Sequence, residues 1–206
     1  MGTLNQMQAR CEQDYSMKTQ IRQIIAASFF CAATSACSQT FPDVHKAVQD
    51  VDPRNAKVDF SLKGSGDDLH VCVDGIEPEA SPMDVFRVFA QTAAQFKEQA
   101  FAKVFLCFRG MDKFVLDGVE FQTIGTEYGT QNPVYTVRTF PEKLTTMTGE
   151  KAFPARAGGV LYLVRVQMED FGELNKAWYI DALLAEAKSK RDAEKPKVFA
   201  EDRDAF

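Results

Sequence analysis

The residues best suited to chemistry in this chain are its five cysteines and two histidines. The histidines are His45 and His70, and the sequence contains neither a C-x-x-C pair nor an H-E-x-x-H motif. Zinc sites usually show such closely spaced ligands, so the sequence predicts no metal site and no cofactor. A serine hydrolase would have to use one of these histidines, and its G-x-S-x-G elbow is missing from the sequence. No catalytic residue is therefore assigned.

Paired carboxylates are a second kind of candidate, because two acids facing each other across a cleft can hydrolyse a glycosidic bond. Adjacent acids occur at Asp67-Asp68 and at Glu169-Asp170. The first pair is expected in a turn, and the second on the charged face of a helix. A hydrolase that uses carboxylates stays an alternative, and it would need a further acid on the opposite side of a cleft.

Cys72 and Cys107 lie in short apolar segments, Leu69–Val73 and Val104–Phe108, which are typical of buried strands. If the two strands are neighbours, a disulfide is possible, because bridging requires Cα atoms within about 7 Å. The alternative is two buried thiols that pack as small hydrophobic side chains. A catalytic thiol is not expected at either position, since apolar surroundings disfavour the thiolate.

A candidate interaction surface is formed by Tyr128, Asn132, Tyr135 and Arg138, around a loop that is expected to lead into a strand. Aromatic side chains bury large areas while their polar tips still form hydrogen bonds, so they recur at binding surfaces. The stretch 128–142 is similar to segments of uncharacterised bacterial envelope proteins, and that resemblance implies no activity. The alternative is a structural turn in which Arg138 pairs on the surface of the sheet.

The N-terminal part has the pattern of an export signal. Lys18 and Arg22 precede an apolar stretch, Ile24–Ala33, of about ten residues, whereas a membrane span needs about 20. The following Thr34-Ser35-Ala36-Cys37 resembles the lipobox of bacterial lipoproteins. In that family the cysteine thiol carries a diacylglycerol and becomes the first residue of the mature protein. The resemblance implies lipid attachment at Cys37, with the bilayer as a partner.

The residues around the lipobox are compatible with more than one location of the mature protein. Ser38 follows the cysteine, and the absence of Asp there implies the outer membrane, facing the periplasm. Thr34 stands where Leu, Val or Ile is usual, so ordinary signal cleavage within 33–36 and release into the periplasm stay open. A third reading is a cytoplasmic protein in which 24–36 forms a packed helix.

Composition predicts one folded domain with a sizeable core, because 45% of the 206 residues are hydrophobic and 17 are Phe. The net charge of −5 offers no basic surface for nucleic acid. The chain is divided into a leader that is misassigned or disordered (1–16, with Met17 as the expected start), a signal peptide (17–36), a tether (37–57), a domain (58–188) and a charged flexible tail (189–206). Within the tether, Val44–Val51 could form a short helix.

The periodicity of the domain predicts both strands and helices. Helices are expected from Ser81-Pro82, a strong capping signal, and from Gly158 to about Lys188. For the second of these, β-branched residues leave a strand over Val160–Val166 as the alternative for its first part. Asp117-Gly118 is typical of a hairpin turn. Strands are expected at Val58–Leu62, Leu69–Val73, Lys103–Phe108, Lys113–Leu116, Val119–Ile124 and Val134–Phe140. The order predicts an α+β domain: an antiparallel sheet with helices packed on one face.

The sequence thus favours a membrane-anchored envelope lipoprotein that acts as a binding or structural module. Its expected partner, besides the bilayer, is another envelope protein or a toxin that it neutralises.

Overall fold

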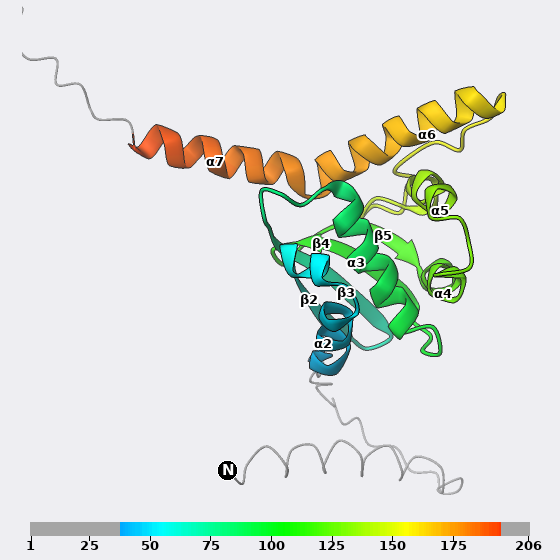
Figure 1. The fold of residues 1–206 in the computed structure, drawn as a ribbon, viewed down its shortest axis with the longest axis horizontal. Helices are drawn as coiled ribbons and strands as arrows, with labels where there is room; N and C mark the ends of the chain where they lie inside the picture. The colour runs from blue at the N-terminus through cyan, green and yellow to red at the C-terminus, as the bar shows by residue number, and fades with distance from the viewer. Residues whose placement is uncertain (1–37, 195–206) are drawn as a thin grey trace, which may run out of the picture. The chain divides into compact units, whose positions relative to one another are not determined.

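The computed structural model describes residues 38–194 (Figure 1). The chain divides into two units, Met1–Ser35 and Ala36–Phe206, and all described residues belong to the second. The expected signal peptide, Cys37 and most of the expected tail lie outside the described residues. Within 38–194, no helix is both long enough and apolar enough to cross a membrane.

A five-stranded sheet lies at the centre of the domain, with its strands in chain order. The strands are β1 (Ser38–Thr40), β2 (Val58–Ser65), β3 (Asp68–Ile76), β4 (Lys103–Phe108) and β5 (Met111–Asp117). All neighbouring strands pair antiparallel except β3 and β4, which are parallel. A parallel pair needs a long crossover, which a helix between β3 and β4 provides. The predicted α+β class is confirmed, and its sheet is mixed instead of wholly antiparallel.

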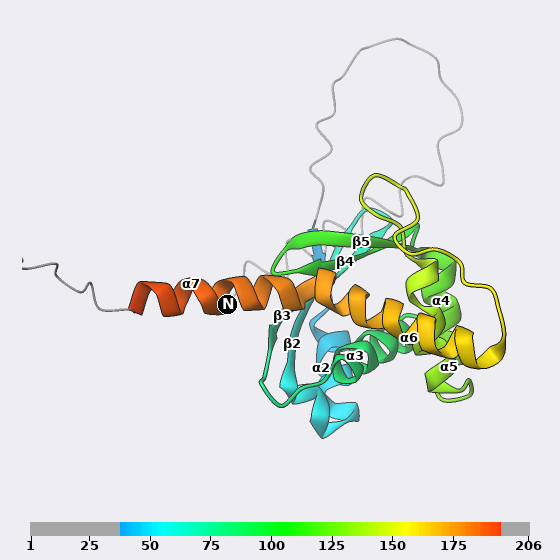
Figure 2. The same cartoon turned by 90° about the horizontal axis from the view of Figure 1, so that it is seen from above.

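Helices cover one face of this sheet, and Figure 2 shows α3 (Pro82–Gln95), α4 (Gly118–Glu127) and α6 (Val160–Asn175) on the same side of it, whereas α7 (Asp181–Glu194) extends away from the sheet. Further helices are α2 (Pro42–Val51) and α5 (Pro133–Thr139), with 3-10 turns at Pro53–Lys57 and Pro141–Lys143. A π-helical turn, Lys176–Ile180, joins α6 to α7, so the predicted long C-terminal helix is present.

The core lies between the sheet and these helices. Side chains alternate along a strand, so Phe60 and Leu62 of β2 and Leu69 and Val71 of β3 all face the helices. Trp178, in the π-helical turn, is fully buried, and its Nε1 donates a hydrogen bond to the Cys107 carbonyl at 2.9 Å. The opposite face of β3 and β4 carries His70, Cys72 and Cys107. The histidine and the two cysteines of the sheet therefore lie on the face that no helix of residues 38–194 covers.

Residues 38–57 belong to the folded domain and do not form the expected tether. β1 pairs with β2, and Val48 of α2 is fully buried in the core. Phe41 packs edge-on against Phe96, the residue that follows α3, with ring centroids 5.0 Å apart. The sequence indicated a short helix at Val44–Val51, but it did not indicate the contacts of Phe41 and Val48 with distant residues, which attach this segment to the domain.

Two of the expected strands are helices. The expected strand Val119–Ile124 lies in α4, because the Asp117 side chain accepts a hydrogen bond from the Val119 N–H and caps a helix. Phe121 and Ile124 then face the core at helical spacing. The expected strand Val134–Phe140 lies largely in α5, which Asn132 caps in the same way.

Candidate functional site

A pocket of about 600 Å³ lies between α3, α4 and α5, and we call it the α3–α4–α5 pocket. Its volume lies within the range of small-molecule sites, about 300–1,000 Å³. Its surface is mainly apolar, with contributions from Met83, Phe86, Ala90, Ile124, Pro133 and Val137. The polar residues along it are Arg54, Arg87, Thr136, Glu127, Tyr128 and Gln131. The pocket therefore combines an apolar wall with two arginines, as sites for amphipathic small molecules do.

The start of α3 fixes the α3 side of this pocket. The Ser81 Oγ accepts from the Asp84 N–H, and the Asp84 carboxylate accepts from the Ser81 N–H at 2.7 Å, which completes a capping box. Residues four apart in a helix lie on one face, so Phe86 and Ala90 line the pocket together. The capping box thereby sets where the pocket wall begins.

Two arginines and two aspartates form a network beside the pocket. Arg54 Nη2 lies 2.6 Å from Asp52 Oδ2, and Arg87 Nη1 lies 2.7 Å from Asp84 Oδ1. Hydrogen bonds from the Arg54 side chain and backbone hold the pKa of Asp52 well below its usual range. Burial alone would raise the pKa of Asp84, but bonds from Ser81 and Arg87 outweigh it and lower that pKa to about 2. Both carboxylates are therefore charged and balance the two guanidinium groups.

One donor of this network is unused. Nη2 of Arg87 is buried and has no hydrogen-bond partner in the part of the chain that the structure describes. A buried donor without a partner costs about 1–3 kcal/mol, and more when it is charged, so it calls for an acceptor. Arg87 lines the α3–α4–α5 pocket, so a rotation of its side chain could bring Nη2 to an anionic group bound there.

Buried amides connect Arg87 to Tyr128. The Arg87 Nε donates to Asn55 Oδ1 at 3.1 Å, and Asn55 Nδ2 donates to Gln91 Oε1 at 2.5 Å. Gln91 Nε2 in turn donates to the Tyr128 hydroxyl at 2.9 Å. Asn55 and Gln91 are almost completely buried, so this chain of bonds holds Tyr128 and Arg87 in fixed positions along one pocket.

The four residues of the predicted interaction surface have separate roles in the structure. Tyr128 lines the α3–α4–α5 pocket, whereas Asn132 caps α5 through a bond to the Val134 N–H. Tyr135 lies on α5, and the Arg138 guanidinium stacks over its ring at 5.0 Å. Arg138 also donates to Gln167 of α6 at 2.5 Å. The loop before Pro133 leads into α5 and not into the expected strand. Of the four residues, only Tyr128 lines the α3–α4–α5 pocket.

A more charged pocket of about 790 Å³ lies on the other side of α4 and α5, next to β5, and Tyr135 is part of its wall. Lysines and acids share this surface, and Lys143 Nζ pairs with Glu120 Oε2 at 2.6 Å. The predicted acid pair on α6 is divided between two arginines, because Glu169 pairs with Arg165 and Asp170 with Arg156. These contacts give the carboxylate hydrolase no specific support.

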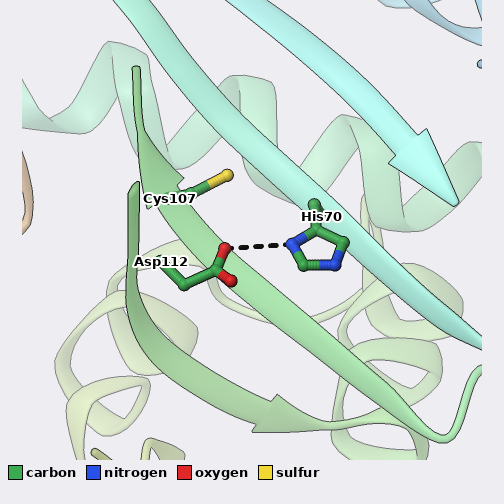
Figure 3. Close-up of side chains that lie close together, drawn as sticks. All are labelled: His70, Cys107 and Asp112. Atoms are coloured by element: carbon green, nitrogen blue, oxygen red, sulfur yellow. Dashed lines mark hydrogen bonds and ion pairs between the residues drawn. The ribbon is translucent and has the colours of Figure 1, made fainter. Parts of the chain in front are cut away.

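The helix-free face of the sheet holds a second cluster, shown in Figure 3. His70 of β3 lies with its Nδ1 2.9 Å from Asp112 Oδ1 of β5, and its ring stacks on Phe105 of β4. Cys72 and Cys107 are linked in a disulfide between β3 and β4. Of the two alternatives for these cysteines, the structure has the bridge.

The sequence indicated the Cys72–Cys107 pair, but it did not indicate that His70 and Asp112 lie beside it, because these residues come from three strands. His70 and Cys72 are two positions apart on β3 and share one face, which was the available signal. Nothing in the sequence placed Asp112 opposite them. The Arg54–Arg87 pair was missed for a similar reason, since Arg54 lies in the segment that was expected to be a tether.

Comparisons of this chain with protein-family models, with curated proteins and with solved structures found no match.

Proposed function

We propose that this chain is an envelope lipoprotein, anchored through Cys37, whose domain binds a small anionic amphiphile in the α3–α4–α5 pocket. The observation that carries the ligand class is the buried Nη2 of Arg87, which lacks a partner among the described residues beside a mainly apolar wall. A carboxylate or phosphate would accept from the guanidinium groups, and an acyl or aromatic body would cover the apolar wall.

Arg54 supports the same class of ligand. Its guanidinium is exposed and lines the pocket, while its partner Asp52 also lies near Arg87 Nε, at 3.4 Å. A bound anion would share both guanidinium groups with Asp52. The bilayer that an acylated Cys37 enters is itself composed of amphiphiles, so the proposed anchor and the proposed ligand class are compatible.

The fold adds a consequence to the proposed anchor. β1 begins at Ser38, the residue after Cys37, and Ser38 is the register partner of Ser65 at the end of β2. A lipid on Cys37 would therefore leave no spacer, and the β2–β3 turn would lie at the bilayer surface. The protein would be held against the membrane instead of ranging away from it on a tether.

Decanoate is a suitable probe for the pocket, and decanol is its uncharged counterpart. We expect calorimetry to detect decanoate binding at one site per chain, with much weaker heat from decanol. Thr136→Phe, which fills the pocket, should abolish binding. Arg54→Gln should weaken it by about tenfold, the value of a charge-assisted bond of about 1.4 kcal/mol.

Arg165→Gln is the matched control, because Arg165 is also exposed and paired with one acid, Glu169, but does not line this pocket. Equal binding of decanoate and decanol, or equal losses in Arg54→Gln and Arg165→Gln, would contradict the ligand class.

The anchor has a separate test. We expect protein from bacterial membranes to have an intact mass that begins at Cys37 and includes acyl chains, and Cys37→Ala to lack them. An uncut and unlipidated chain in the cytosol would refute the anchor and leave the ligand-binding proposal standing.

A further inference from the structure

Four side chains with metal-binding donors meet on the helix-free face of the sheet. A ring nitrogen of His70, Cys107 Sγ and an Asp112 carboxylate oxygen all lie within 4.8 Å of one another, and Figure 3 shows the three side chains. Cys72 is bonded to Cys107, so its sulfur lies at the same place. The cluster is distinct from the α3–α4–α5 pocket, and it does not depend on the function proposed for that pocket.

We propose that this cluster is a redox-gated site for one thiophilic divalent cation, with Zn²⁺ as the favoured ion. When the Cys72–Cys107 disulfide is reduced, the site offers two thiolates, one imidazole and one carboxylate. This is a donor set for closed, tetrahedral zinc coordination. While the disulfide is intact, its sulfurs carry no charge and only His70 and Asp112 remain as strong donors, so the cation and the disulfide exclude each other.

The required geometry is close to the one present. Ligand atoms around a tetrahedral zinc lie roughly 3.3–3.8 Å apart, given bonds of about 2.0–2.3 Å. Since the three donors of His70, Cys107 and Asp112 already lie within 4.8 Å, rotation of side chains can bring them to that spacing. The two sulfurs must separate, which breaking their bond allows.

The sheet holds the four backbone positions in place. Cys72 and Cys107 are register partners in the parallel pair β3–β4, with Cα atoms 4.4 Å apart. Cys107 and Asp112 are register partners in β4–β5, beside a bulge. The other face of these strands is packed in the core, so the backbone positions should remain after reduction. A site built on rigid strands needs little reorganisation to bind an ion.

The neighbouring residues orient the donors and give access to them. Phe105 stacks on the His70 ring with centroids 4.6 Å apart and an angle of 11° between the planes, which fixes the plane of the imidazole. A pocket of about 210 Å³ includes His70, Cys72 and Asp112 in its wall, so an ion can reach the cluster from solvent. Lys63 also lies along this pocket, but it is exposed and its long side chain can turn away.

The chemistry of the switch is balanced with a dithiol as the reductant. The disulfide takes two electrons and two protons from the dithiol, which becomes a disulfide, and Cys72 and Cys107 become thiols. Binding of the divalent cation then displaces one proton from each thiol, so two protons are released per ion. Reoxidation removes two electrons from the thiolates, forms the S–S bond and expels the ion.

Cobalt provides a direct test, because Co²⁺ replaces Zn²⁺ and its bonds to thiolate absorb light. We would use the full chain with Cys11, Cys31 and Cys37 replaced by serine, so that Cys72 and Cys107 are the only cysteines. We expect one Co²⁺ per chain after reduction with a phosphine, with thiolate-to-cobalt charge-transfer bands and visible bands of tetrahedral intensity. Zn²⁺ should displace the Co²⁺, and the oxidised protein should show none of these bands.

Variants separate this site from adventitious binding to two thiols. His70→Gln and Asp112→Asn should each lower the Co²⁺ affinity by about tenfold or more. Asp59→Asn, an exposed acid on neighbouring β2, should leave the affinity unchanged. Cys72→Ser cannot form the disulfide and should bind Co²⁺ without reductant, more weakly and through one thiolate.

Three results would overturn the proposal. They are equal binding by oxidised and reduced protein, binding that is insensitive to both His70→Gln and Asp112→Asn, and absence of Co²⁺ binding in both the reduced protein and Cys72→Ser. If the reduced protein unfolds and does not bind Co²⁺, this result counts as absence of binding in the reduced protein.

Discussion

Two glycines illustrate how single residues set the packing of this domain. Gly125 of α4 contacts α3 so closely that a Cβ there would run into the backbone carbonyl of Ala93. At Gly172 of α6, by contrast, a Cβ would point into open space, with no atom within 4 Å of it. Both lie inside helices, where glycine costs about 1 kcal/mol relative to alanine. The same substitution should therefore have opposite effects at the two sites.

We expect Gly125→Ala to lower the free energy of unfolding by about 1–3 kcal/mol, because α3 and α4 must move apart. Gly172→Ala should raise it by about 0.5–1 kcal/mol, because alanine favours the helix and meets no obstacle. Urea unfolding of both variants checks this. Equal effects of one sign would show that α3 and α4 do not approach each other this closely.

The carboxylate of Asp84 makes stability depend on pH. Its pKa in the folded protein, about 2, lies below its ordinary value of 3.8, so the folded state favours the charged form. The stabilisation is fully present above 3.8 and is lost as the pH falls through about 2. Asp84→Asn should cost about 1 kcal/mol at neutral pH, the usual cost of a weakened helix cap.

The difference between the parent protein and Asp84→Asn should shrink as the pH is lowered below 4 in a series of urea titrations. A constant difference over that range would show that the charge of Asp84 does not contribute. Asp59→Asn, in which an exposed acid is changed, is the comparison variant.

At the scale of elements, the segment before β2 decides where the domain starts. α2 buries Val48, and Asn55 in the following 3-10 turn donates to the Val48 carbonyl at 2.6 Å and to Gln91. Removal of these elements would expose the core next to β2 and α3. It would also leave Gln91, which is buried, without its Asn55 partner.

We therefore expect a chain that begins at Ser38 to unfold cooperatively. A chain that begins at Val58, the start expected from the sequence, should be at least partly unfolded, because it lacks Val48 and the Asn55 bonds. Far- and near-ultraviolet circular dichroism during heating checks this. Cooperative unfolding of the shorter chain at an unchanged temperature would instead support the prediction that residues 37–57 are a tether.

Elements with local signals were predictable, and those that depend on distant contacts were not. The capping box at Ser81 and the alternation of apolar and polar residues in β2 indicated their structures without help from the rest of the chain. α4 differs, because Asp117-Gly118 fits both a hairpin turn and a helix start. Gly118 packs so closely on the Phe101 carbonyl that a side chain would not fit, and this contact is invisible in the sequence.

At the scale of the whole molecule, the Cys72–Cys107 disulfide closes a loop with a sequence separation of 35 residues that includes α3. Such a crosslink restricts the unfolded chain and typically contributes about 2–4 kcal/mol to stability. Because it joins two central strands, its loss should lower the stability of the domain as one cooperative unit instead of loosening one end.

Reduction should therefore lower the free energy of unfolding by about 2–4 kcal/mol, measured in guanidinium with Cys11, Cys31 and Cys37 replaced by serine. Trp178 fluorescence is a suitable signal, since its indole contacts the Cys107 carbonyl. An unchanged guanidinium midpoint after reduction would indicate that the disulfide does not contribute to the stability of the paired strands β3 and β4.

The sequence alone determined the α+β class, the capped helix α3, the long C-terminal helix and most strands, because capping and periodicity act over a few residues. It also provides the export and lipobox pattern on which the anchor proposal rests. Only the tertiary structure brought Arg54 beside Arg87, placed Asp112 against His70 and joined Cys72 to Cys107. These contacts join segments that lie far apart in the chain, and their distances are set by the parallel β3–β4 pair and by helix packing, which no local pattern encodes.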